Sequence, residues 1–189
     1  MMSRSRLIRL AILCEDHRTE RFACRLCNRY GVGVASVTVA PEGKGSASDW
    51  VKHHYPDMVR KRRSKNYQKN LGLLVLIDGD EHRCHARHRE LANELAGANI
   101  EPRSKTDSIA EFVPTWSIET WLARLCGHPV AENSKLKYDS TLRSLWDEGA
   151  AEAATVRRSI EAWGQQDDNP PPSLADAYQE AIRVGLIRY

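Results

Sequence analysis

Acidic side chains gather at three places in the chain, and each place follows a segment with the pattern of a β-strand. Glu15 and Glu20 follow the first segment, Asp78 and Asp80 follow the third, and Glu119 follows the fourth. Carboxylates that meet in a protein have raised pKa values unless a cation balances them. Mg²⁺ and Mn²⁺ prefer oxygen ligands, and two such ions clamp the attacking and leaving oxygens of a phosphodiester. The acids therefore predict a divalent-metal site suited to phosphoryl chemistry.

The D-x-D spacing of Asp78 and Asp80 strengthens this prediction. Alternate residues at an extended strand end project to the same side, so both carboxylates are expected to face one ion. Gly79 between them would leave room for a metal or a phosphate. For any single acid, a helix cap or a solvated loop charge is the simpler interpretation. Three acidic groups that all follow strands favour the metal site.

The elements that would position these acids alternate along the chain. Apolar and β-branched runs predict strands over residues 6–13, 33–40, 71–77 and 109–113. Helical spacing predicts helices over residues 19–29, from about 46 to a break at Pro56 with a restart at 57, over 85–98, and over 117–125 with Ser117 as N-cap. This alternation indicates an α/β fold with a mainly parallel, four-stranded sheet sandwiched by helices. In such folds ligands bind at the carboxyl ends of the strands.

The pattern changes near residue 128. Residues 136–189 have helical patterns only, with helices expected over 150–163 and 174–186. We therefore expect an α/β domain over residues 1–128 and a helical C-terminal extension over residues 129–189.

The charge of the chain is unevenly distributed. The 189 residues include 28 Lys and Arg against 25 Asp and Glu, but residues 1–100 have a net charge of +7 and residues 101–189 of −4. An anionic partner is therefore expected at the front half. No apolar run approaches the roughly 18 residues of a membrane span, and no signal peptide is evident, so we expect a cytoplasmic protein without a membrane segment.

Two basic features could bind a nucleic acid. Six basic residues lie just before the third strand: Arg60, Lys61, Arg62, Arg63, Lys65 and Lys69. Such a patch would bind phosphates without sequence preference, whereas a solvated helix face is the alternative. Lys44, in a Gly-Lys-Gly-Ser loop after the second strand, could neutralise a phosphate, and a plain flexible connector is an equally good interpretation.

The five cysteines are irregularly spaced and are interpreted as reduced thiols. Cys84 together with His82, His85 and His88 could complete a zinc site, although ordinary core and surface positions are the better interpretation.

The order of the acidic motifs resembles a known family. E-x-x-x-x-E after a first strand, D-x-D after a hydrophobic strand and a later glutamate at a helix start resemble the Toprim (topoisomerase–primase) fold. The chain looks most similar to compact Toprim nucleases of the overcoming-lysogenisation-defect type, which accompany ATPases in phage defence. Residues 113–122, VPTWSIETWL, resemble a P-x-x-x-I-E-x-W-L segment of small bacterial Toprim-like proteins. The resemblance covers roughly residues 6–126.

The resemblance implies roles for individual residues. Glu15 would act in the chemistry or at a metal, Asp78 and Asp80 would bind Mg²⁺, and Glu20 and Glu119 correspond to further acids of that branch. The expected function is therefore a Mg²⁺- or Mn²⁺-dependent nuclease acting on DNA or RNA, in which Glu15, Asp78, Asp80 and Lys44 serve catalysis. It would work beside a separate ATPase, because this sequence has no ATPase motif.

A second hypothesis belongs to a different class. The domain would be a non-catalytic regulatory or partner-binding subunit of such a complex. Asp16, which stands where the family usually has glycine, and the acidic rear half favour this alternative. Primer synthesis is a third possibility and lacks any separate nucleotide-binding signature.

Overall fold

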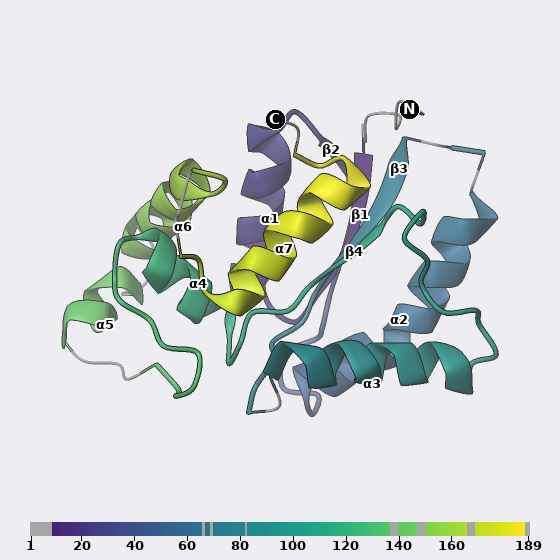
Figure 1. The fold of residues 1–189 in the computed structure, drawn as a ribbon, viewed down its shortest axis with the longest axis horizontal. Helices are drawn as coiled ribbons and strands as arrows, with labels where there is room; N and C mark the ends of the chain where they lie inside the picture. Colours follow the sequence, from purple (N-terminus) through teal and green to yellow (C-terminus); the bar gives the residue numbers. More distant parts are fainter. Residues whose placement is uncertain are drawn as a thin grey trace.

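A four-stranded parallel sheet forms the centre of the fold (Figure 1). The computed structural model describes residues 9–65, 67–68, 70–81, 83–136, 140–146, 150–165 and 169–187. The strands are β1 (Arg9–Cys14), β2 (Gly33–Val39), β3 (Leu71–Leu76) and β4 (Ile109–Phe112), in the order β2-β1-β3-β4. All three pairings are parallel, which confirms the predicted α/β class and is consistent with a Toprim-like fold.

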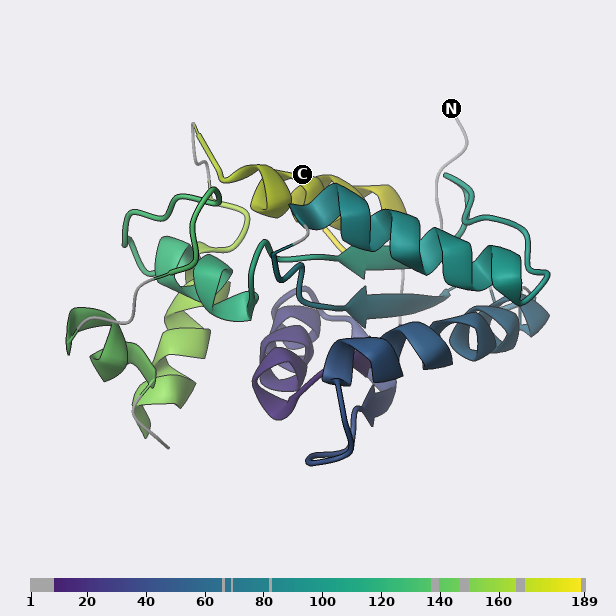
Figure 2. The same cartoon turned by 90° about the horizontal axis from the view of Figure 1, so that it is seen from below.

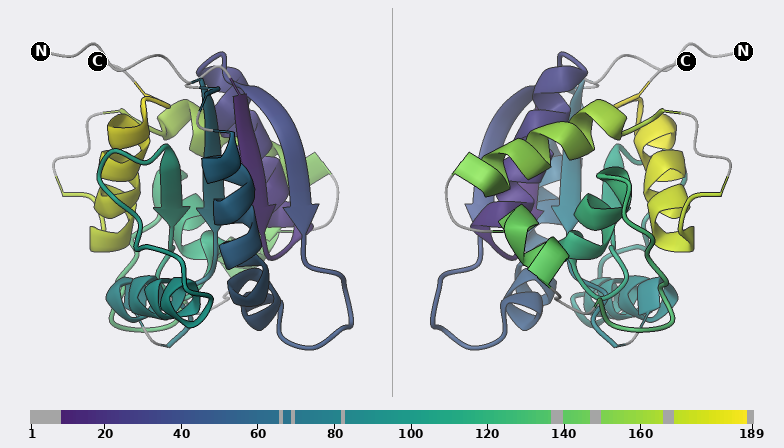
Figure 3. Two further views of the ribbon diagram at one scale, coloured as in Figure 1. Left: turned by 90° about the vertical axis from the view of Figure 1, so that its right-hand side faces the viewer. Right: turned by 90° about the vertical axis from the view of Figure 1, so that its left-hand side faces the viewer.

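Helices cover both faces of this sheet (Figure 3). The helices are α1 (His17–Arg29), α2 (Ala47–Ser64), α3 (Arg83–Gly97), α4 (Ile118–Leu125), α5 (Ser140–Trp146), α6 (Ala150–Ala162) and α7 (Pro172–Val184). Leu13 and Val75 belong to the core cluster that includes α2 and α3, whereas Ile12 and Leu76 belong to the cluster of α1, α4, α6 and α7. This alternation along each strand is the two-residue period of a sheet that is buried on both faces.

Trp163, which directly follows α6, joins the C-terminal helices to the α/β part. Its buried ring lies 5.5 Å from that of Phe22 on α1, 5.7 Å from Phe112 on β4 and 4.6 Å from Tyr178 on α7, measured between centroids. Aromatic pairs at these separations add to the free energy gained from apolar burial. The segments on either side of residue 128 therefore share one core, and their division into two domains stays a prediction.

The predicted break at Pro56 is wrong. Helix α2 continues through this proline from residue 47 to residue 64. Val51, Tyr55 and Val59 lie fully buried on the same side as Pro56. A proline removes one intrahelical hydrogen bond, but packing of an apolar helix face against a sheet supplies most of a helix's stability in a protein.

The other predicted elements of the α/β part are present, with ends that differ by a few residues. Residues 6–8 of the first predicted strand lie outside the described part of the chain. None of the described helices is both long enough and apolar enough to cross a membrane.

Candidate metal centre at the strand ends

The carboxyl ends of β1 and β3 form the point at which the strand order reverses. From β1 the chain proceeds to β2 on one side, and β3 lies on the other side of β1. In open parallel sheets such a switch point is where ligands bind. Glu15 directly follows β1 and Asp78 is the second residue after β3, so the topology brings both acids to this point. Figure 2 shows the arrowheads of β3 and β4 pointing toward the segment that carries α4.

Glu15 and Asp78 are fixed by hydrogen bonds to the backbone. The Asp78 N–H donates to Oε1 of Glu15 at 2.8 Å. Oδ1 of Asp78 accepts the N–H of Ile118, the first residue of α4, at 3.1 Å. Ser117 occupies the N-cap position as predicted, but its side chain makes no capping bond. Asp78 therefore supplies the capping oxygen that Ser117 was expected to supply.

The two acids have raised pKa values because they are buried among other carboxylates. Burial raises the pKa of Glu15 to about 7; the Asp78 N–H opposes this shift and the charge of Asp80 adds to it. Burial, followed by the charges of Glu15 and Glu119, raises the pKa of Asp78 well above its usual range. Negative charge at this point is therefore only partly balanced by the protein.

The D-x-D segment does not have the extended geometry that was predicted. Strand β3 ends at Leu76, before Asp78, and Asp80 has a left-handed backbone with φ of 49°. Its N–H donates to the carbonyl of Trp116 at 3.0 Å, and the side chain of Asp80 is 54% exposed. A turn held by the neighbouring loop, rather than strand alternation, positions the second aspartate.

Gly79 serves backbone packing and not the approach of a ligand. Its N–H donates to the carbonyl oxygen of Pro114 at 2.8 Å. A Cβ atom at Gly79 would lie 2.9 Å from that oxygen, closer than real Cβ contacts allow. The space left by the absent side chain is thus filled by the loop after β4.

Arg87, one of the basic residues that follow the D-x-D motif in the sequence, holds this turn from α3. Only 2% of this residue is exposed. Its Nε donates to the carbonyl of Asp78 at 2.9 Å, and its other nitrogens contact Oδ2 of Asp80 at 2.7 Å and Oε2 of Glu90 at 2.6 Å. The packing of α3 on the sheet buries this arginine against the D-x-D turn.

The two further predicted acids, Glu119 and Glu20, have different surroundings. Glu119 is buried and forms an ion pair with Arg18, whose Nε also donates to Glu152 of α6 at 3.2 Å. Glu20 instead lies 2.7 Å from Nδ1 of the exposed His17. Glu119 therefore belongs to the carboxylate site with a guanidinium as its neighbour, whereas Glu20 is engaged at the surface of α1.

An open depression of about 580 Å³ lies over these acids. Its described lining consists of Asp16, Asp78, Asp80, Glu81, Trp116, Ser117, Glu119 and Lys135. Five of these residues are acids and only one is basic. The basic residue, Lys135, lies outside every sequence motif. The depression is a strongly acidic surface with the Glu15–Asp78 contact beside it.

Asp16 has a local structural role. Its carboxylate accepts hydrogen bonds from the N–H and the hydroxyl of Thr19, at 2.7 and 2.8 Å, and so caps α1. An aspartate at this position is among the best N-caps. Capping explains why an aspartate fits where the resembling family usually has glycine.

The basic segment lies at the other end of the sheet. In Figure 1, α2 runs toward the end at which β3 begins. Arg63 donates to the carbonyls of Glu101 and Pro102 and to Asp107, while Arg62 is only 8% exposed. The structure therefore does not bring this segment to the carboxylates, and Arg60 and Arg63 contact the loop before β4.

The remaining predicted basic residues are exposed or undescribed. Arg60 donates to Asp57 and to the carbonyl of Ala98, and Lys61 and Lys65 are exposed. Lys69 lies outside the described residues. Lys44 is exposed in the loop between β2 and α2, at the carboxyl edge of the sheet (Figure 3).

Two of the candidate zinc ligands approach each other. Cys84 and His88 of α3 meet Asp176 of α7, an acid that no sequence motif marks. His85 lines a neighbouring cavity, and His82 lies outside the described residues.

Comparison with known proteins identifies no relative of this chain. No family model, no curated protein and no solved structure matches it. The resemblance to Toprim nucleases therefore stays a prediction that depends on the order of the motifs.

Proposed function

We propose that this protein is a nuclease that cleaves phosphodiester bonds of DNA or RNA with Mg²⁺ or Mn²⁺. The observation that carries the proposal is the contact between Glu15 and Asp78 at the switch point of the sheet, where both carboxyl groups have raised pKa values. Perturbed acids in such a position are typical of functional sites.

The donor set fits a hard divalent cation. One oxygen of Glu15 and one of Asp78 each accept a hydrogen bond from a backbone N–H. No described residue donates to the second oxygen of either carboxylate. Asp80 adds an exposed carboxylate from the same turn. Mg²⁺ binds through one or a few carboxylates and keeps several waters, which an open depression permits. Glu15, Asp78 and Asp80 would hold the ion.

Glu119 and Glu20 are less available as ligands for a second ion. Glu119 reaches the depression, so a second ion there would compete with the guanidinium of Arg18. Glu20 would first have to leave His17. The proposal therefore rests on the first three acids.

A bound divalent cation would stabilise charge on the phosphate and lower the pKa of a bound water. The chain's own residues position it: Asp78 is fixed by the α4 N-terminus, and Arg87 fixes the turn that carries Asp80. The raised pKa of Glu15, about 7 without metal, would fall beside a divalent cation, so that its carboxylate would be ionised and able to hold the ion. The five acids of the depression would repel the phosphates of a nucleic acid, so bound cations are also needed before this substrate can approach.

The same proposal includes the partners expected from the resemblance. A nucleic acid would contact Lys135 in the depression and Lys44 at the same edge of the sheet. The exposed Lys61 and Lys65 would contact only a substrate that extends to the opposite edge. The nuclease would act in the cytoplasm, as the effector of a phage-defence system with a separate ATPase.

One observation favours the non-catalytic alternative. Arg18 and Arg87 already pair with Glu119 and Asp80, so two of the acids have protein cations beside them. In that case the site would be a structural polar network of a regulatory subunit. The two candidates differ in whether the site binds a divalent ion.

The test combines cleavage with metal binding. Wild-type protein is incubated with plasmid, single-stranded DNA and tRNA in Mg²⁺ or Mn²⁺, beside Asp78→Asn and Glu15→Gln, and Asp57→Asn serves as the control at an exposed acid of α2. We expect metal-dependent cleavage that the first two variants lose by a factor of at least about 100 and the control keeps.

Metal binding is measured by the melting temperature in Mn²⁺. A nuclease site predicts a rise for the wild type and for Asp57→Asn, but none for Asp78→Asn. Equal cleavage by all variants, or a wild type whose melting temperature ignores both ions, would contradict the proposal. If the protein binds metal but does not cleave, the assay is repeated with the ATPase partner present.

A further inference from the structure

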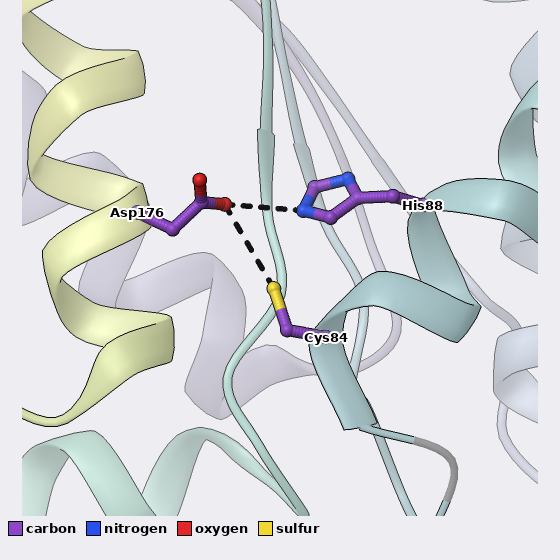
Figure 4. Close-up of side chains that lie close together, drawn as sticks. All are labelled: Cys84, His88 and Asp176. Carbon is purple, nitrogen blue, oxygen red and sulfur yellow. Dashed lines mark hydrogen bonds and ion pairs between the residues drawn. The ribbon is translucent and has the colours of Figure 1, made fainter.

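A second cluster of metal-binding side chains joins α3 to α7 and shares no residue with the Glu15–Asp78 contact. Figure 4 shows Cys84 and His88 projecting from α3 toward Asp176 on α7. Oδ2 of Asp176 lies 3.1 Å from Nε2 of His88 and 3.8 Å from Sγ of Cys84. All three ligand atoms lie within 4.8 Å of one another. From this geometry we propose that Cys84, His88 and Asp176 bind one Zn²⁺ ion that fastens α7 to α3.

The separations match a tetrahedral zinc site. Bond lengths of about 2.3 Å to sulfur and about 2.0–2.1 Å to nitrogen or oxygen place the ligand atoms about 3.3–3.6 Å from one another. The observed separations of 3.1 and 3.8 Å bracket this range, so small side-chain rotations suffice. Cys84 and His88 are four residues apart on one helix and therefore lie on the same face of α3.

The histidine is oriented as a zinc ligand needs to be. Its Nδ1 lies 2.7 Å from Oε2 of Glu111, a residue of β4 that is only 4% exposed. Metal-binding histidines usually donate their other ring N–H to a carboxylate, which fixes the tautomer and the ring. Glu111 thus directs Nε2 of His88 at Asp176 and Cys84.

The ligand set selects zinc over the ion of the strand-end site. A thiolate and an imidazole suit Zn²⁺, whereas Mg²⁺ requires oxygen ligands. A thiolate, a neutral imidazole and a carboxylate also balance the two charges of the ion. Cys84 and Asp176 line a cavity of about 300 Å³, which can supply a water as the fourth ligand.

An ion pair without metal is the alternative, with a protonated His88 between Glu111 and Asp176. That arrangement needs neither the sulfur of Cys84 nor any metal. The sulfur therefore distinguishes the two cases.

The experiment uses the full chain, treated with EDTA and then titrated with Co²⁺ or Zn²⁺. Co²⁺ reports sulfur ligation through a thiolate-to-cobalt charge-transfer band. We expect this band, at one Co²⁺ per chain, in the wild type and its loss in Cys84→Ser. Cys24→Ser, which changes another half-buried thiol on α1, serves as the matched control and keeps the band.

Zn²⁺ is expected to raise the melting temperature of the wild type by about 5–10 °C at a hundredfold excess over its Kd. Cys84→Ser and Asp176→Asn lose this rise, whereas Cys24→Ser and Asp78→Asn keep it. The band also shows whether Asp78→Asn, which removes a ligand of the other site, leaves this one intact. A wild type without the band, or a Cys84→Ser protein that retains it, overturns the proposal.

Discussion

Two buried carboxylate sites on the same sheet differ in how the protein balances their charge. At Glu111 on β4, the ring of His88 lies 2.7 Å away, Nε of Arg103 lies 3.3 Å away and the hydroxyl of Tyr55 donates at 2.5 Å. At the ends of β1 and β3, the charges that raise the pKa of Asp78 most are the carboxylates of Glu15 and Glu119.

The pKa directions follow these neighbours. Burial would raise the pKa of Glu111, but the hydrogen bond with His88 and the charge of Arg103 hold it below its usual value. In return, the bonds of His88 to Asp176, Cys84 and Glu111 overcome its burial and raise its pKa to about 11. The carboxyl group of Asp78 forms no ion pair with a described residue, and its pKa is raised. Burial alone therefore does not identify a functional acid; the absence of balancing charge does.

The largest effect is expected from a substitution at Glu111, the carboxylate with cations beside it. Glu111→Gln removes the buried anion between the half-buried cations His88 and Arg103, whose remaining ion-pair partners are Asp176 and Glu180, so we expect a loss of about 3–5 kcal/mol in the free energy of unfolding. Urea denaturation in EDTA measures it. Glu101→Gln, at an exposed glutamate in the loop before β4, is the control and should change little. A loss below about 1 kcal/mol at Glu111 would remove the contrast between the two sites.

The pH dependence of the metal-free protein tests the unbalanced site. The folded pKa of Glu15, about 7, lies above its ordinary value of 4.5. The folded state therefore binds more protons between these values, so stability from this group is full below pH 4.5 and is lost as the pH rises to about 7. The loss amounts to about 3 kcal/mol.

The measurement is the difference in unfolding free energy between the wild type and Glu15→Gln at several pH values in EDTA. The variant keeps an oxygen for the Asp78 N–H and lacks the titration. Asp80 and Asp16 strengthen the effect and Arg87 weakens it. A difference that does not change between pH 4.5 and 7 would show that other charges already balance Glu15.

A smaller effect is expected at the turn that supports the unbalanced site. Gly79→Ala places a Cβ atom 2.9 Å from the Pro114 carbonyl, so the two loops must separate at a cost of about 1–3 kcal/mol. Gly97→Ala, at the end of α3 with open space around it, is expected to be neutral or stabilising. Thermal melts of both variants provide the test, and equal melting temperatures would contradict the role given to Gly79.

The smallest effect is expected from Asp78→Asn, which should raise the free energy of unfolding slightly or leave it unchanged. Asp78→Asn retains the oxygen that caps α4 and relieves repulsion with Glu15, so the metal-free protein should be as stable as the wild type or up to about 1 kcal/mol more stable. Asp107→Asn should instead destabilise by about 1 kcal/mol, because Asp107 pairs with Arg63 at 2.7 Å. Destabilisation by both substitutions would mean that Asp78 is balanced after all.

Much of the fold could be predicted from local patterns. Leu71–Leu76 is a nearly continuous apolar run, and such runs are typical of interior parallel strands. Thr19, Phe22, Leu26 and Cys27 are buried on one side of α1, as helical spacing predicts. Pro56 was misjudged because its local effect on a helix is real but weaker than the burial of its neighbours.

The candidate sites were only partly predictable. Glu15, Asp78 and Asp80 could be selected because they follow strands, and parallel strand ends meet at one edge. Arg18 had no such signal, and only the packing of α3 placed Arg87 on the D-x-D turn. Asp176 lies 92 residues from Cys84, so no spacing rule could join them.

By itself, the sequence determined the periodicities, and therefore the strands, most helices, their parallel order and the edge at which the acids meet. Only the tertiary structure decided which acids have cations beside them, where the basic segment of α2 lies, and that α7 brings Asp176 to Cys84 and His88. The physical reason is the sequence separation over which each kind of interaction acts. Hydrophobic patterns act over a few neighbouring residues, whereas the charge balance of a buried group depends on whatever residues the packed chain places within a few ångströms.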